Sequence, residues 1–164
     1  MMGSGKSTVG RRLAERLGCC FVDTDAEIER EASASVAEIF AREGEAGFRA
    51  RERAAIEALR GARAVVSLGG GAVAQAGIGE TLASTGMIVY LRAQPETLLR
   101  RVADGDTRPL LRGLDGPGRL DKLRSLLEAR AEHYERAQIV IDTDEDDVDT
   151  VVDELARRLS RERT

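Results

Sequence analysis

The sequence predicts an α/β fold in which helices cover both faces of a mostly parallel β-sheet, giving three layers. Strand and helix signals alternate along nearly the whole chain, which is typical of parallel strands joined by helices. Glycine-rich turns at residues 3–5 and 69–71 adjoin these elements, as in sheets that bind ligands at one edge. We expect a single domain over 1–164, because this length suffices for one sizeable core.

The first half of the chain contains clear signals for where its elements begin and end. Gly18 and Gly61 follow helical patterns and stop them, and the Ser35–Glu38 pair forms a capping box at the start of another helix. We therefore expect, in order, a helix at 7–17, a strand at 19–23, helices at 25–32, 35–44 and 45–60, and a strand at 64–68.

The second half continues the alternation and contains one long loop. Residues 104–118 hold four glycines and two prolines, so we expect a loop there that acts as a lid. The last helix has acidic residues first and arginines last, which suits its dipole. The expected elements are a helix near 75–84, a strand at 87–91, helices at 95–103 and 119–136, a strand at 138–142 and a helix at 147–161.

Composition excludes two classes of partner. The net charge is −4 and aromatic residues make up 3%, which argues against a nucleic-acid partner. The sequence contains no apolar run long enough for a membrane span. Cys19 and Cys20 are adjacent and lack a metal-binding spacing, so we expect packed, reduced thiols in a cytoplasmic protein. We also expect a monomer.

The stretch GSGKST, residues 3–8, is the second half of a phosphate-binding loop. Glycines there let backbone N–H groups face a phosphate, and the following helix directs its positive end to the same place. Of 25 basic residues only Lys6 and Lys122 are lysines, so a lysine between Gly5 and Ser7 is no accident of composition. Ser7 is placed to ligate Mg²⁺. The alternative is a plain glycine turn before an amphipathic helix.

Two further features point to chemistry at the same edge of the sheet. Asp23 and Asp25 stand at the carboxyl end of a predicted strand, where one carboxylate can serve a metal and the other a substrate hydroxyl. Asp25 could instead be only the N-cap of the next helix. The triplet Gly69–Gly71 directly follows a strand, which allows close approach of the backbone to a ligand. The alternative is a flexible turn, which would need fewer glycines.

With these motifs in order, the chain resembles the shikimate kinases, a family of small P-loop kinases. The matching stretches are MGSGKSTVGRRLA, DTDAEIE, IFAREGEAGFRARE, SLGGGAV, TRPLL, ARAEHY and IDT, and they span nearly the whole chain. The resemblance implies a P-loop kinase-like three-layer sandwich. It also implies transfer of the ATP γ-phosphoryl group to the 3-hydroxyl of shikimate in aromatic amino-acid biosynthesis.

The resemblance also implies roles for individual residues, with ATP and Mg²⁺ as cofactors. Lys6, Asp25 and Arg108 are expected to act in catalysis, and Ser7 and Asp23 to hold Mg²⁺. The expected nucleotide-binding residues are Gly3, Ser4, Gly5, Lys6, Ser7, Thr8, Arg101 and Arg108. The expected shikimate-binding residues are Asp25, Arg49, Gly70, Gly71 and Arg130.

The family pattern has an apolar strand and a glycine ahead of Met2, so we expect the sheet of this chain to lack its central first strand. Two alternatives stay open. One is a kinase of the same architecture with another small acceptor, such as gluconate. The other is a truncated, non-catalytic nucleotide-binding remnant.

Overall fold

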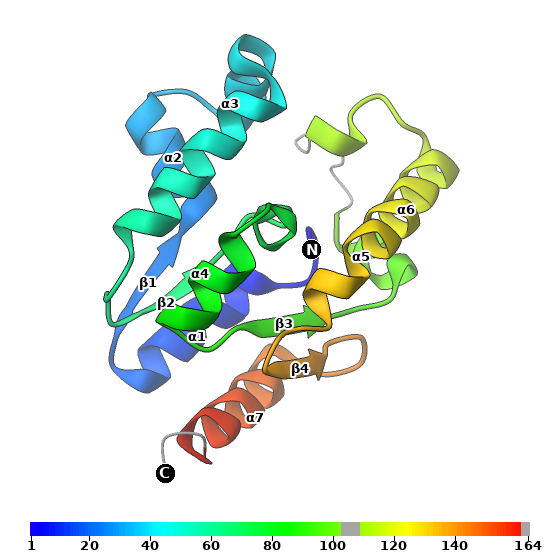
Figure 1. The fold of residues 1–164 in the computed structure, drawn as a ribbon. Coiled ribbons are helices and arrows are strands. Elements are labelled where there is room, and N and C mark those ends of the chain that lie inside the picture. The colour runs from blue at the N-terminus through cyan, green and yellow to red at the C-terminus, as the bar shows by residue number, and fades with distance from the viewer. Residues whose placement is uncertain (103–108, 162–164) are drawn as a thin grey trace.

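Short parallel strands alternate with helices in the computed structural model, which describes residues 1–102 and 109–161 (Figure 1). Each strand overlaps one that the sequence predicts, and the α/β class with parallel strands is confirmed. The strands are β1 (Cys20–Asp23), β2 (Ala64–Ser67), β3 (Val89–Arg92) and β4 (Ile139–Asp142).

The helices also follow the predicted order. The α-helices are α1 (Lys6–Leu17), α2 (Thr24–Ala32), α3 (Val36–Ala58), α4 (Ile78–Thr85), α5 (Pro95–Arg101), α6 (Gly116–Tyr134) and α7 (Val148–Arg161), with 3₁₀ turns η1 (Ala72–Ala74) and η3 (Pro109–Leu111).

The predicted lid at 104–118 is wrong at its C-terminal end, because α6 already begins at Gly116. The Asp115 side chain accepts a hydrogen bond from the Gly118 backbone N–H at 2.8 Å and caps the helix, and a proline stands in its first turn. Glycine and proline, which suggested a loop, are here the first turn of a capped helix. Residues 104–108 of the predicted lid lie outside the described residues.

The four strands form two separate parallel pairs. β1 pairs with β2, placing Asp23 opposite Ser67, and β3 pairs with β4, placing Arg92 opposite Asp142. A cavity of about 530 Å³ lies between β2 and β3, lined along them by residues 64–70 and 87–91. Because this space separates β2 from β3, the described strands make two two-stranded sheets and the expected single sheet is interrupted.

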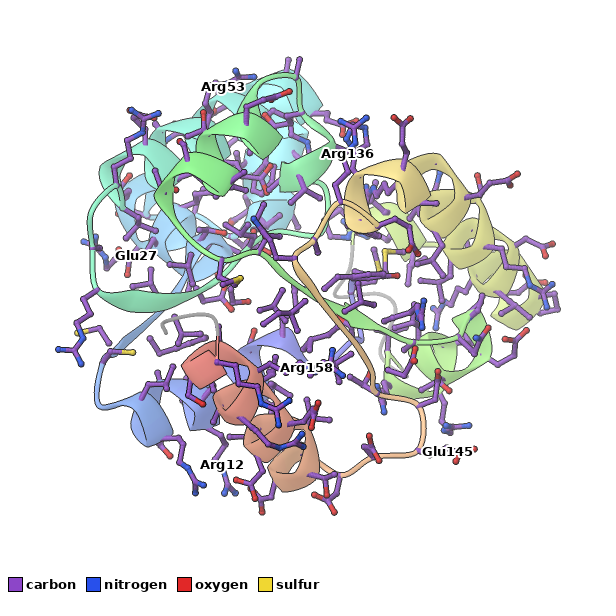
Figure 2. All side chains as sticks on the ribbon, turned by 60° about the horizontal axis from the view of Figure 1, so that its bottom comes forward. Arg12, Glu27, Arg53, Arg136, Glu145 and Arg158 are labelled. Atoms are coloured by element: carbon purple, nitrogen blue, oxygen red, sulfur yellow. The ribbon has the colours of Figure 1, made fainter. Side chains whose placement is uncertain are left out.

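The helices bury their apolar faces against the strands and against one another. α1 and α7 pack together with β3 and β4 around residues that include Leu13, Ile141 and Leu155. A second cluster, with Ile28, Ile39 and Phe48, joins α2 to α3. Charged residues such as Arg12, Arg53 and Glu145 are exposed and point outward around the molecule (Figure 2).

α3 bends sharply at Gly44, whose φ of 69° and ψ of −176° are not helical. The sequence predicts separate helices that meet at this point, and the structure has one element with a kink there. The segment after the kink carries Arg49 and Glu52 toward the glycine turn that follows β2. The kink therefore decides where the basic and acidic groups of α3 lie.

Candidate active site

The phosphate-binding loop leads directly into the N-terminus of α1. Gly3 and Gly5 have positive φ values of 73° and 86°, which glycine adopts without strain. A Cβ on Gly3 would lie 3.0 Å from the Leu98 carbonyl oxygen, so this backbone also packs closely against α5. The first N–H groups of α1 and its positive dipole end suit a phosphate at this turn.

Two polar side chains of this loop form hydrogen bonds to the backbone of the loop itself. The buried Ser4 hydroxyl donates to the Met1 carbonyl oxygen at 2.9 Å, and the Lys6 ammonium donates to the same oxygen at 2.6 Å. Thr8 is exposed on the first turn of α1. The loop thus brings Gly3, Ser4, Gly5, Lys6, Ser7 and Thr8 together at one helix end.

Ser7 and Asp23 form the candidate metal site. The Ser7 hydroxyl donates to Asp23 Oδ2 at 2.6 Å, and Asp23 Oδ1 accepts from the Asp25 backbone N–H at 3.1 Å. A hydroxyl beside one carboxylate fits Mg²⁺, which usually takes one or two carboxylates, waters and substrate phosphates. No cluster of three or more acidic, histidine or cysteine ligands occurs within 1–102 and 109–161.

Asp23, and not Asp25, is the N-cap of α2. The alternative of Asp25 as a helix cap is therefore wrong, because the helix starts one residue earlier, at Thr24. Asp25 lies in the first turn of α2, and its Oδ1 is buried and lies 2.9 Å from the point where a Cβ on Gly69 would stand. Its carboxylate is thereby directed to the glycine turn.

Thr24 fixes the glycine turn against α2. Its hydroxyl is fully buried, donates to the Ser67 carbonyl oxygen at 3.2 Å and accepts from the Gly69 N–H at 3.2 Å. These two bonds tie the end of β2 to the start of α2. The turn and Asp25 therefore keep a defined separation.

Arg49 on α3 lies against the glycine turn and between two carboxylates. Its Nη1 donates to Glu52 Oε2 at 2.7 Å, and its Nη2 donates to Glu45 Oε1 at 3.0 Å. A Cβ on Gly71 would be 2.6 Å from Nη2, so only glycine allows this approach. Burial acts to lower the pKa of Arg49, but its hydrogen bonds to the Glu52 and Glu45 carboxylates and their negative charges outweigh burial, and the pKa is raised.

Arg130 on α6 reaches the same turn from the opposite side. Its Nη1 donates to the Gly70 carbonyl oxygen at 2.9 Å, and the Tyr134 hydroxyl donates to the same oxygen at 2.5 Å. Burial raises the pKa of Tyr134, and the neighbouring Arg130 partly offsets this rise. Helices α3 and α6, which are distant in sequence, thus direct one arginine each to adjacent glycines.

Glu52 is fully buried beside Asp25. Its Oε2 holds Arg49 and accepts from the Gln75 side-chain amide at 2.6 Å, and its Oε1 lies 2.1 Å from the position of a Cβ on Gly69. Burial raises the pKa of Glu52 and the negative charge of Asp25 adds to the rise, whereas Arg49 opposes it. A side chain larger than hydrogen at position 69 would collide with this carboxylate.

Arg101 lies apart from this cluster. The Arg101 guanidinium donates to the Thr143 hydroxyl and carbonyl oxygens, which places it beside the loop after β4. That loop contributes Asp144, Glu145 and Asp146 to a second, acidic hollow of about 520 Å³. Arg108 lies outside the described residues.

Three contributors to the site were not assigned from the sequence: Glu52, Gln75 and Tyr134. Glu52 stands three residues after Arg49, a spacing that pairs side chains on one helix face, so its pairing could have been predicted. Tyr134 stands four residues after Arg130, and the same rule applies to it. Gln75 comes from a different element, and only the folded chain brings it to Glu52.

None of the helices within the described part of the chain combines the length and apolar content that a membrane crossing needs. Cys19 and Cys20 carry free thiols, but the expectation that both are packed is wrong, because Cys20 is exposed at the start of β1.

Comparison with known proteins gives consistent matches over almost the full chain. A family model described as shikimate kinase matches residues 2–160. The chain is 44% identical over 166 residues to a shikimate kinase of Chlorobium phaeobacteroides strain BS1, with 97% of this chain and 83% of the relative covered. It is 45% identical over 163 residues to a shikimate kinase of Symbiobacterium thermophilum, with 97% and 92% covered.

One solved structure that matches this fold contains a ligand. It is the shikimate kinase from Acinetobacter baumannii in complex with shikimate, with a TM-score of 0.89 and 39% identity. The match covers 98% of this chain and 89% of that chain, so it includes both the phosphate-binding loop and the helices that carry the two arginines.

Proposed function

Because this chain belongs to the shikimate kinase family, we propose that it transfers the ATP γ-phosphoryl group to the 3-hydroxyl of shikimate, a step toward chorismate and the aromatic amino acids. Enzymes of this family are ATP-dependent kinases that use Mg²⁺. The family and the shikimate-bound relative favour shikimate over gluconate as the acceptor.

One observation carries the proposal for the acceptor: Arg49 and Arg130 face adjacent glycines from two different helices. Planar guanidinium groups match the geometry of a carboxylate and remain charged at all working pH values. We assign these two arginines to the shikimate carboxylate, with Gly70 and Gly71 lying close to the ring. Held at that end, the acceptor presents its hydroxyls toward α2.

Asp25 is our candidate for the group that orients the attacking hydroxyl. Its carboxylate points to the same glycine turn and stands two residues from the Ser7–Asp23 pair. A carboxylate there can accept the hydroxyl hydrogen bond and direct the oxygen toward the phosphoryl group. Phosphoryl transfer depends mainly on such positioning and on charge stabilisation.

The loop at the start of α1 is our candidate for the nucleotide phosphates. The backbone of Gly3, Ser4 and Gly5 and the first turn with Lys6 and Thr8 would face them, and Ser7 and Asp23 would hold Mg²⁺. When bound, the metal neutralises negative charge on the phosphates. Arg101 is proposed to border the adenine, and Arg108 to neutralise charge on the transferring group.

We further propose that the enzyme works as a cytoplasmic monomer on a small molecule and binds neither nucleic acid nor membranes. The free thiols of Cys19 and Cys20 and the net charge of −4 support this proposal. Size-exclusion chromatography with light scattering would test the monomer, and a different mass would refute it.

Substitution of either arginine tests the acceptor assignment. Arg49→Ala or Arg130→Ala should raise KM for shikimate by about ten- to a hundredfold, the loss expected for one charge-assisted partner. The measurement is ADP formation with shikimate, and with gluconate for comparison. Arg53→Ala is the matched control, because Arg53 is exposed on the same helix as Arg49.

Equal KM values in all three variants would overturn the arginine assignment. Turnover of gluconate but not shikimate would overturn the acceptor, and no ADP formation with either would support the non-catalytic alternative.

A further inference from the structure

The two carboxylates that hold Arg49 differ in how firmly they are held. Glu52 is fully buried, and both Arg49 and Gln75 bond to its Oε2. The Glu45 side chain is 63% exposed, and its side-chain hydrogen bonds within the described part of the chain come from Arg49. Glu52 is therefore a fixed partner of Arg49, whereas Glu45 can move away at little cost.

Glu45 also holds a particular edge of the guanidinium. Its Oε1 accepts from Arg49 Nε at 3.3 Å and from Nη2 at 3.0 Å, and Glu52 takes the separate Nη1. The Nε–Nη2 edge is one that can bind a carboxylate with two parallel hydrogen bonds. The same Nη2 lies against Gly71, beside the turn where the acceptor is proposed to bind.

Glu45 competes with any incoming anion for the exposed part of the Arg49 guanidinium. Arg49 is 19% exposed at its side chain, so its open face is limited, and Glu45 covers part of it from one turn earlier on α3. A pair four residues apart on a helix, with its carboxylate 63% exposed, is worth only a small free energy, so a better-placed carboxylate can displace Glu45.

We propose that Glu45 sets the affinity for the acceptor by competing with the acceptor carboxylate for the Nε–Nη2 edge of Arg49. Glu45 is a specificity-determining residue in this scheme and touches no reacting atom. The inference rests on the proposed function, since it assigns Arg49 to the shikimate carboxylate. Glu52 keeps the guanidinium in place while Glu45 is exchanged for the acceptor.

Two substitutions separate loss of contact from loss of charge. Glu45→Gln removes the negative charge. Glu45→Asp keeps the charge, but its side chain is one methylene shorter, so its carboxylate lies farther from Arg49 and binds it more weakly. Both should lower the Kd for shikimate, measured by titration calorimetry without nucleotide, by about two- to fivefold, the range that an exposed ion pair is worth. In turnover assays the change should appear in KM and not in kcat.

Glu43→Gln is the matched control. Glu43 lies two residues before Glu45 on the same helix and pairs with Arg51 at 2.9 Å, so its substitution removes an equal charge without releasing Arg49. The Kd of this variant should stay at the wild-type value. The methyl ester of shikimate is the second control, because an acceptor without a carboxylate should bind the Glu45 variants and the wild type alike.

Each outcome has a distinct meaning. Equal or weaker shikimate binding by both Glu45 variants would overturn the proposal, the weaker result showing that Glu45 instead orients Arg49 for the acceptor. A matching gain in Glu43→Gln would also overturn it, because general charge would then be the cause. No shikimate binding by the wild type would overturn the proposed function itself, together with this inference.

Discussion

Among single residues, Glu52 is unusual because it is an acidic side chain with no exposed surface. Burial raises its pKa above 4.5, and Arg49 opposes that shift without cancelling it. The folded state therefore binds a proton at Glu52 more tightly than the unfolded state does. The burial that directs Arg49 to the glycine turn thus carries a cost in stability at neutral pH.

Glu52→Gln should change how stability depends on pH. In the wild type, Glu52 lowers the free energy of unfolding as pH rises from about 4.5 through the raised pKa, since the folded state loses its extra proton there. The glutamine side chain that replaces Glu52 cannot titrate. The free energy of unfolding of the variant, minus that of the wild type, should therefore increase as pH rises from about 4.5 through the raised pKa of Glu52. Urea unfolding at several pH values measures the difference.

Glu57→Gln, at an exposed position on the same helix, is the control for this prediction. Its stability should follow the wild-type pH curve. A Glu52→Gln curve parallel to the wild type would mean that Glu52 has the same proton affinity in the folded and unfolded states.

Among the elements, α3 depends on a single glycine for its shape. Gly44 has a φ of 69° with an extended ψ of −176°, a backbone region that is essentially reserved for glycine. The bend is also bridged by the ion pair of Glu43 with Arg51, on either side of it. The backbone at Gly44 sets the direction of the segment with Glu45, Arg49 and Glu52.

Gly44→Ala should destabilise the protein by about 1–3 kcal/mol from backbone strain alone, because no atom lies within 4 Å of the added Cβ. Gly79→Ala is the matched control inside α4, where the Cβ has ordinary contact at 3.9 Å. It should stabilise by about 0.5–1 kcal/mol through helix propensity. Chemical denaturation measures both, and a Gly44→Ala variant as stable as Gly79→Ala would refute the strain argument.

At the scale of the whole molecule, the main feature is the cavity of about 530 Å³ between the two strand pairs. Side chains of α1 and α7 line its faces, and residues of β2 and β3 line its sides. Side chains that face empty volume lack packing partners there, so this cavity lowers the stability of the fold.

Filling part of this space should raise stability. Ala156 lies on α7 beside the cavity, so Ala156→Met should add about 0.5–2 kcal/mol to the free energy of unfolding in the 164-residue chain. Ala14→Met is the control: Ala14 is buried in α1 and does not line the cavity, so overpacking should cost about 1–3 kcal/mol. Thermal and urea unfolding would distinguish the two, and equal losses in both would show that the cavity does not accept a side chain.

The order and type of the elements could be predicted before the structure, because that information lies in short stretches of the chain. Short apolar runs marked all four strands that the structure describes, and Gly18, Gly61 and the Ser35–Glu38 capping box marked helix ends. The motifs also identified most of the residues that gather at the glycine turn, since Asp25, Gly70 and Gly71 each stand near the carboxyl end of a strand. Local spacing could even have assigned Glu52.

How these elements pack against one another could not be predicted, because it depends on contacts formed in the folded chain. Composition suggested a loop where α6 begins, because glycine and proline serve helix starts as well as loops. The separation of the strands into two pairs depends on contacts between residues far apart in the chain, as does the bond of Gln75 to Glu52. The exposed Glu45 and the buried Glu52 look alike in sequence, and their different roles follow from burial, which packing alone sets.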